Sequence, residues 1–185
     1  MTKSGTILGI DPGTNLLGFG VVRINEKGKP EYVDMGVLDI RKEADPYNKL
    51  ARICEFIEGL CEQYKPDYMA IESPFLDKNA QVIFKLGRAQ GAAMVAAASH
   101  GVAITEYAPR KAKIAICGNG NASKEQVSTM VQKTLGIKID TKHLDATDAL
   151  AIAMCHYYQL SSPLTSGEGA GSWKKFIKDN PDRVK

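Results

Sequence analysis

Residues 6–22 read TILGIDPGTNLLGFGVV, and this stretch determines the fold. A short apolar run ends on the carboxylate of Asp11, the pair Pro12-Gly13 turns the chain, and a second β-rich run follows over residues 16–24. Two strands this close in sequence form an antiparallel hairpin. Asp11 is therefore predicted at the end of a central strand, where the backbone leaves the sheet.

The carboxylate of Asp11 needs compensation at such a place, because burial disfavours its charge. A hydrogen-bonding turn, a cationic partner or a metal ion would each provide it. An aspartate before Pro-Gly often bonds the amides of its own turn. Asp11 alone therefore leaves a structural and a functional interpretation open.

Composition indicates a single domain with a core, since 44% of the 185 residues are hydrophobic. No apolar run is long enough to span a bilayer. The N-terminus lacks the apolar region of a signal peptide, which predicts a cytoplasmic protein with no membrane partner. Cys54, Cys61, Cys117 and Cys155 show no C-x-x-C spacing and are predicted to be reduced core thiols rather than zinc ligands.

The net charge of +3 is unevenly distributed along the chain. Residues 108–142 carry seven Lys and Arg against two acidic residues, residues 161–185 carry five against three, and the rest is net acidic. This distribution fits a polyanion held beside an acidic centre. An ordinary solvated basic face is the alternative.

Hydrophobic periodicity predicts the element order β-β-β-α-β-α-β-α-α-α. Strands are predicted over residues 7–11, 16–24, 31–40, 68–72 and 102–107, and helices over 46–64, 79–99, 109–116, 123–135 and 144–160. Three antiparallel strands followed by crossover strands give an α/β fold, with a mixed five-stranded sheet and helices on both faces. Residues 1–160 are predicted to form this domain, and residues 161–185 a flexible basic tail.

The predicted helix over residues 79–99 carries a run of Gly and Ala at helical spacing. Small residues allow another helix to approach closely. That helix belongs either to the same core or to a second copy across a dimer.

Three further acids occupy places comparable to that of Asp11. Glu72 ends the strand over residues 68–72, and Asp145 and Asp148 lie on one face near the start of the last helix. Like charges at that spacing repel unless a cation lies between them. Hard divalent cations such as Mg²⁺ prefer carboxylate oxygens, and two of them about 4 Å apart support an in-line phosphoryl displacement. The four acids together therefore predict a metal-dependent phosphoryl-transfer site.

Several segments resemble the RuvC family of Holliday junction resolvases. In chain order these are GIDPG at 9–13, DYMAIE at 67–72, Phe75, KNA at 78–80, KLGRAQG at 85–91, Tyr107-Ala108 with Arg110, KEQV at 124–127 and DATDALAIA at 145–153. The matches run in order from about residue 5 to residue 158 and cover the predicted domain.

The resemblance implies a ribonuclease H-like fold and a homodimeric, Mg²⁺-dependent endonuclease. Such an enzyme places symmetric nicks in two strands of like polarity at a four-way DNA junction and leaves 5′-phosphate and 3′-hydroxyl ends. The resemblance further implies two Mg²⁺ ions per active site, with Mn²⁺ as a substitute, and an association with a RuvA–RuvB branch-migration complex.

The resemblance also assigns site residues. The family's four catalytic, metal-binding carboxylates fall on Asp11, Glu72, Asp145 and Asp148. Its junction-contacting aromatic falls on Phe75, and its basic DNA-contacting positions fall on Lys113 and Lys124, with Arg110 as a further match.

Simpler interpretations stay open for some of these residues. Phe75 also fits a core residue of a loop, and Lys113 and Lys124 also fit surface lysines. His143 fits a cap or surface residue as well as a proton acceptor or metal contact. The pair Ser73-Pro74 departs from the family pattern, and so does the tail beyond residue 160.

Three other functions share part of the pattern. An ATP-binding protein of the actin and sugar-kinase type has a similar Asp-x-Gly-Thr hairpin but needs two such domains. A YqgF-like nuclease acting on RNA shares the opening motif, yet Phe75 and residues 85–91 favour the resolvase. A junction-binding protein with a degenerate site would lack some of the four acids.

Overall fold

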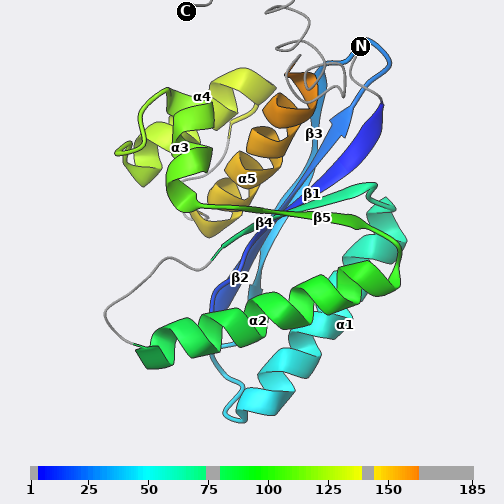
Figure 1. Ribbon diagram of the computed structural model, residues 1–185, viewed down its shortest axis with the longest axis vertical. Coiled ribbons are helices and arrows are strands. Elements are labelled where there is room, and N and C mark those ends of the chain that lie inside the picture. The colour runs from blue at the N-terminus through cyan, green and yellow to red at the C-terminus, as the bar shows by residue number, and fades with distance from the viewer. Residues whose placement is uncertain (1–3, 74–79, 139–143, 163–185) are drawn as a thin grey trace, which may run out of the picture.

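The computed structural model describes residues 4–73, 80–138 and 144–162 (Figure 1). The predictions for Pro74, Phe75 and His143, and for the tail beyond residue 162, lie outside the described residues. The other sequence-based predictions can be compared with the structure.

The predicted order of strands and helices is confirmed. The strands are β1 (Gly5–Asp11), β2 (Leu16–Ile24), β3 (Pro30–Asp39), β4 (Tyr68–Glu72) and β5 (Ala103–Tyr107). The helices are α1 (Pro46–Tyr64), α2 (Ala80–Ser99), α3 (Pro109–Cys117), α4 (Lys124–Leu135) and α5 (Leu144–Ser161). The predicted and observed ends differ by one or two residues where they differ at all.

The five strands form one mixed sheet in the order β3-β2-β1-β4-β5. The first three strands pair antiparallel, whereas β4 is parallel to both β1 and β5. Ile10 of β1 lies opposite Ile71 of the parallel strand β4. Asp11 and Glu72 are the next residues along these two strands, so they are also neighbours. The sheet therefore brings both carboxylates to the same edge.

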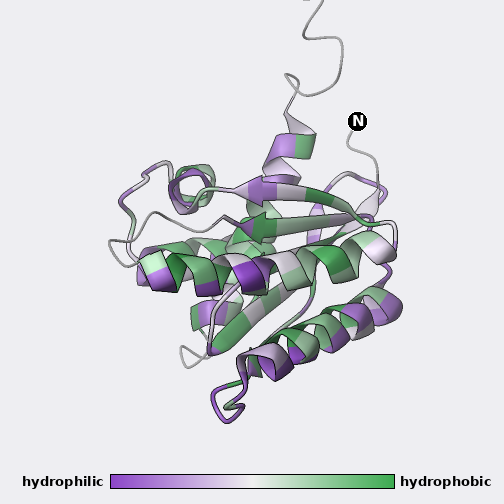
Figure 2. Ribbon diagram, turned by 60° about the horizontal axis from the view of Figure 1, so that its bottom comes forward, coloured by the Kyte–Doolittle hydropathy of each residue, from purple (hydrophilic) through white to green (hydrophobic). Residues whose placement is uncertain are grey.

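Helices cover both faces of the sheet, as predicted (Figure 1). Leu8 and Ile10 pack in the core with α1 and α2, whereas Ile7 packs in the core with α3, α4 and α5. Because side chains alternate along a strand, Asp11 shares the face of Ile7 and therefore points to the α5 side. Figure 2 shows hydrophobic and hydrophilic ribbon alternating along α1, as expected for a helix with one buried face.

Helix α5 lies directly on the sheet because β1 and β2 carry glycine at the contact. A Cβ atom on Gly9 would lie 2.1 Å from the carbonyl oxygen of Ala149, and one on Gly18 would lie 2.2 Å from that of Asp145. No side chain fits in either gap. Ala146, Ala149 and Ala153 are fully buried on the helix side. Backbone packing thus fixes the start of α5 against the end of β1.

Side chains cap the N-termini of α1 and α4. The Asp45 carboxylate accepts hydrogen bonds from the backbone N–H groups of Tyr47 and Asn48, both at 2.8 Å. Ser123 caps α4 in a capping box with Gln126, which stands at the third helical position.

The small residues of α2 face two ways. Ala89, Ala93, Ala96 and Ala97 are buried in the core that this helix shares with α1. Gly87 and Gly91 instead face open space, since a Cβ atom on either would meet nothing within 4 Å. The alanine run therefore belongs to the core of the chain, which was one of its two predicted uses.

The four cysteines are thiols, of which Cys61 and Cys155 are buried and Cys54 and Cys117 are partly buried. Within the three described ranges, none of the helices combines the length and the apolar character that crossing a bilayer requires.

Candidate active site

Three predicted acids converge where β1 ends and α5 begins. Asp11, Asp145 and Asp148 each place a carboxylate oxygen within 4.8 Å of the others. Asp11 is held by the sheet, and the other two lie one turn apart on α5. Residues that are far apart in the chain thus form one acidic group.

Glu72 lies beside this group rather than within it, at the end of β4. The next residue is fixed to the neighbouring strand, because the backbone N–H of Ser73 donates to the carbonyl oxygen of Tyr107 at 2.9 Å. Burial raises the pKa of Glu72 most, and the charges of Asp11 and Asp148 raise it further, so its carboxylate is within electrostatic range of the acidic group.

The carboxyl group of Asp11 is strongly perturbed. Burial raises its pKa from 3.8 to about 7, and the negative charges of Asp148 and Asp145 add to this effect. Lys124 acts in the opposite direction. The fold therefore disfavours the state in which all of these acids are ionised, unless a positive charge lies close to them.

The neighbouring acids show the same effect. Burial, followed by the charges of Asp11 and Asp148, raises the pKa of Glu72 from 4.5 to about 8. Burial also raises the pKa of Asp148, although its hydrogen bond to Lys124 lowers it in part. The site therefore holds more negative charge than its surroundings stabilise at neutral pH.

Lys124, which opens α4, supplies part of the missing positive charge. Its Nζ atom lies 2.6 Å from Oδ2 of Asp148 and 3.6 Å from Oδ1 of Asp145. Burial opposes the charge of this lysine, but the bond to Asp148 and the nearby acids raise its pKa overall. A residue predicted to contact DNA thus lies inside the acidic centre.

The other basic candidates are Lys113 and Arg110, both on α3. Lys113 lowers the pKa values of Glu72 and Asp148, so it is close to the centre. The stem of Arg110 lies against Gly120 in the turn before α4, where a Cβ atom would come within 2.6 Å of its Cγ.

The acidic group fits a hard divalent cation. Its donors are carboxylate oxygens, which Mg²⁺ and Mn²⁺ prefer, and they come from two rigid elements. The raised pKa values of Asp11 and Glu72 are what buried and closely spaced acids are expected to show, and a bound cation would lower them.

The pairing of Lys124 with Asp148 is the feature that the sequence did not predict. The two residues are 24 positions apart on different helices, so no local spacing links them. The sequence showed a basic segment over residues 108–142 and an acidic centre, but it did not pair a lysine with an acid.

Sequence comparison identifies the family. The family described as "Crossover junction endodeoxyribonuclease RuvC" matches residues 7–156. A protein of that name from Bacteroides fragilis is 50% identical over 185 residues, covering 99% of this chain and 97% of that protein. Another from Porphyromonas gingivalis is 46% identical and covers 99% of this chain and 98% of that protein.

Solved structures agree with the sequence relatives. Thermus thermophilus RuvC in complex with a Holliday junction substrate is 30% identical, with a TM-score of 0.75, and covers 85% of this chain and 96% of that one. The yeast mitochondrial Holliday junction resolvase Ydc2 has a TM-score of 0.62 at 14% identity, which supports the fold alone. The sheet is thus that of the ribonuclease H-like resolvases, and the chain belongs to the RuvC family of crossover junction endodeoxyribonucleases.

Proposed function

We propose that this chain resolves four-way DNA junctions by hydrolysing one phosphodiester bond in each of two strands of like polarity. The observation that carries the proposal is the gathering of Asp11, Asp145 and Asp148 within 4.8 Å, in a chain of the RuvC family. Glu72 completes the proposed catalytic set from the adjacent strand. The products are 5′-phosphate and 3′-hydroxyl ends.

The proposed cofactor is a pair of Mg²⁺ ions, for which Mn²⁺ substitutes. When bound, such ions supply positive charge that polarises the attacking water and stabilises the leaving oxygen. Asp11 is the proposed shared ligand because its carboxylate lies within 4.8 Å of both α5 acids and its charge also acts on Glu72 of the adjacent strand. The close contact of α5 with Gly9 and Gly18 keeps these ligands in place.

The basic residues near the acids have a proposed role toward the phosphate. Lys124 neutralises Asp148 in the absence of DNA, and its flexible side chain can turn to an incoming phosphate oxygen. Lys113, on α3, adds a second positive charge near the same acids. Arg110 is proposed to contact the backbone further out, and Phe75 stays the proposed aromatic contact at the crossover.

A homodimer would provide the two active sites that paired nicks require. Helix α2 offers a face for this contact, since Phe84 and Val95 are 69% and 68% exposed and lie on the same side as Gly91. Glycine at the contact would allow two copies of the helix to approach closely. An association with a RuvA–RuvB complex stays a prediction from the family resemblance, which a pull-down with junction DNA would test.

The test uses a synthetic mobile four-way junction labelled on each strand in turn. Wild type with Mg²⁺ should give symmetric nicks that DNA ligase reseals. Asp11→Asn should bind the junction without cutting it, because the substitution keeps the shape and removes a ligand charge. Asp39→Asn is the matched control, since Asp39 lies on the surface beside Arg41.

Binding without nicking by the wild type, in Mg²⁺ and in Mn²⁺, would contradict the proposal. Cleavage of RNA with the junction left intact would point instead to a nuclease of the YqgF type. Equal loss of binding and cleavage in Asp11→Asn would remove Asp11 from the proposed ligand set.

A further inference from the structure

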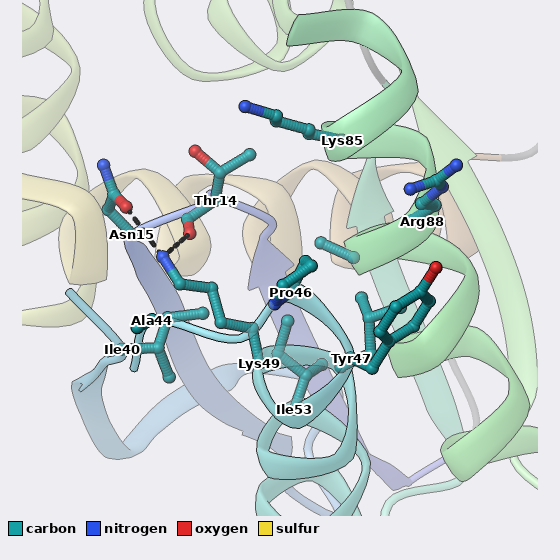
Figure 3. Close-up of a pocket in the computed structure, with 12 residues that line it drawn as sticks. Thr14, Asn15, Ile40, Ala44, Pro46, Tyr47, Lys49, Ile53, Lys85 and Arg88 are labelled. Carbon is teal, nitrogen blue, oxygen red and sulfur yellow. Dashed lines mark hydrogen bonds between the residues drawn. The ribbon is translucent and has the colours of Figure 1, made fainter. Parts of the chain in front are cut away.

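A cavity of about 470 Å³ lies between the β1–β2 turn and helices α1 and α2 (Figure 3). Its floor is apolar and includes the buried side chains of Ile53 and Ala89. Its walls also carry three cations, namely Lys49 from α1 and Lys85 and Arg88 from α2. The cavity thus combines an apolar floor with positive charge.

The positive charge of this cavity is not neutralised within the described ranges. No carboxylate there forms an ion pair with Lys49, Lys85 or Arg88. The Nζ atom of Lys49 donates only to uncharged oxygens, the carbonyl of Thr14 at 3.3 Å and Oδ1 of Asn15 at 3.1 Å. Like charges gathered around one hollow attract an anion.

The cavity and the acidic centre share one turn of the chain. The turn follows Asp11, the last residue of β1. It includes Thr14 and Asn15, which line the cavity and precede β2. Four residues span at most about 14 Å, which equals roughly four nucleotides of duplex rise at 3.4 Å each. A phosphate a few nucleotides from one held beside Asp11 is thus within reach of the cavity, around the turn that leads from the α5 side of the sheet to the α1–α2 side.

We propose that this cavity binds a backbone phosphate of the same junction, a few nucleotides from the bond that is cut; this rests on the proposed function. Figure 3 shows Lys85 extending from α2 toward Thr14, while Lys49 reaches the same turn from α1. Arg88 presents a planar guanidinium, which suits the oxygens of a phosphodiester. The phosphate thus bridges α2 and the turn that carries Asp11.

The choice of variants follows from these contacts. Lys49 holds the turn itself, so its loss would move Asp11 as well as remove a charge. Lys85 and Arg88 are exposed and make no hydrogen bond to a described residue, so the double variant Lys85→Gln/Arg88→Gln removes charge alone. Lys27→Gln/Lys29→Gln removes the same two charges from the β2–β3 turn, at the other end of β2, and is the control.

The measurement is the equilibrium affinity for a fluorescent four-way junction, with divalent metal chelated, over a range of NaCl concentrations. The slope of log K against log salt should become shallower by about 0.9 for each phosphate that is no longer neutralised, hence by about 0.9 in the double variant, which loses one phosphate. Affinity at low salt should fall for all junction sequences alike. The control and the charge-preserving Lys85→Arg/Arg88→Lys should keep the wild-type slope.

An unchanged slope in Lys85→Gln/Arg88→Gln would overturn the proposal. So would a change of its oligomeric state in sedimentation, since Arg88 would then hold two copies together through α2. The wild-type nicking assay separates this proposal from the proposed function. Normal nicking with unchanged slopes refutes the phosphate site alone, whereas shallower slopes without nicking refute the proposed function alone.

Discussion

The Nζ atom of Lys124 lies 2.6 Å from Oδ2 of Asp148, so a lysine at the start of α4 serves as an internal counter-ion for the acidic centre. The same amine lies 3.6 Å from Asp145. A metal ion that binds these carboxylates must therefore compete with an ammonium group already there. A cation held by these carboxylates would take over the role of Lys124 and leave its amine free for a phosphate.

This competition predicts the behaviour of Lys124→Gln. Without metal, the variant should be less stable than wild type at pH 8, because the acids lose a neutralising charge. Its melting temperature should rise more than that of wild type when Mg²⁺ is added, because no ammonium group has to be displaced. Thermal denaturation with and without MgCl₂ measures both effects.

Lys133→Gln, near the other end of α4, is the matched control and should respond to Mg²⁺ as wild type does. Equal metal responses in wild type and Lys124→Gln would contradict the competition. Nicking by Lys124→Gln should fall by about 10² or more, as expected when a preorganised positive group is removed from a phosphoryl-transfer site.

The acids predict an unusual dependence of stability on pH. Asp11 and Glu72 have pKa values of about 7 and about 8, against ordinary values of 3.8 and 4.5. Between pH 4 and pH 8 the folded chain therefore holds protons that the unfolded chain has lost. The metal-free protein should become less stable as pH rises through this window and level off above it.

Asp11→Asn should remove part of this dependence. At pH 8 with metal chelated, it should raise the free energy of unfolding by on the order of 2 kcal/mol, after allowance for solvent screening. Urea unfolding at several pH values measures the effect, with Asp39→Asn as control. A metal-free Asp11→Asn protein less stable than wild type at pH 8 would show that the carboxylate contributes a structural hydrogen bond instead.

Gly9→Ala tests the contact that positions α5. The added methyl would meet the carbonyl oxygen of Ala149 at 2.1 Å, so the helix must move or the chain must strain. We expect a loss of about 1–3 kcal/mol in denaturant unfolding, as for other overpacked cores, together with a larger loss of nicking. Gly59→Ala on α1, where nothing lies within 4 Å, should instead stabilise the chain slightly.

Buried His156 should make the stability of the fold depend on pH in the opposite direction. Its Nδ1 lies 2.7 Å from the hydroxyl of Tyr107, and its buried Nε2 has no hydrogen-bond partner in the described part of the chain. Burial lowers its pKa from 6.5 to about 4. The neutral ring therefore stabilises the fold above pH 6.5, and this contribution is lost as pH falls toward 4.

In His156→Asn, the difference in unfolding free energy between pH 7 and pH 4 should shrink by on the order of 2 kcal/mol. An identical pH dependence in wild type and His156→Asn would mean that the pKa of the histidine is the same in the folded and the unfolded chain.

The sequence predicted the element order and the acidic residues because both depend on local patterns. Asp11 and Glu72 stand where apolar runs stop, and parallel strand ends necessarily meet at one sheet edge. The spacing of Asp145 and Asp148 by itself places them on one side of a helix. None of these inferences requires knowledge of a tertiary contact.

Other features depend on contacts between distant segments and were not predictable in this way. The pairing of Lys124 with Asp148 depends on how α4 lies against α5. The cation-lined cavity depends on α1 and α2 meeting beside the first turn. The alanine run of α2 predicted a close neighbour but not which one, because small side chains permit contact without specifying a partner.

The glycine contacts beneath α5 also bear on how this protein can be modified. The helix that carries two of the proposed ligands rests on strand backbone, so repacking that layer would shift the reaction centre along with the core. Thermostability and turnover are therefore not independently adjustable on this side of the sheet. Directed evolution for heat resistance should collect its beneficial substitutions on the opposite layer, in α1 and the buried face of α2.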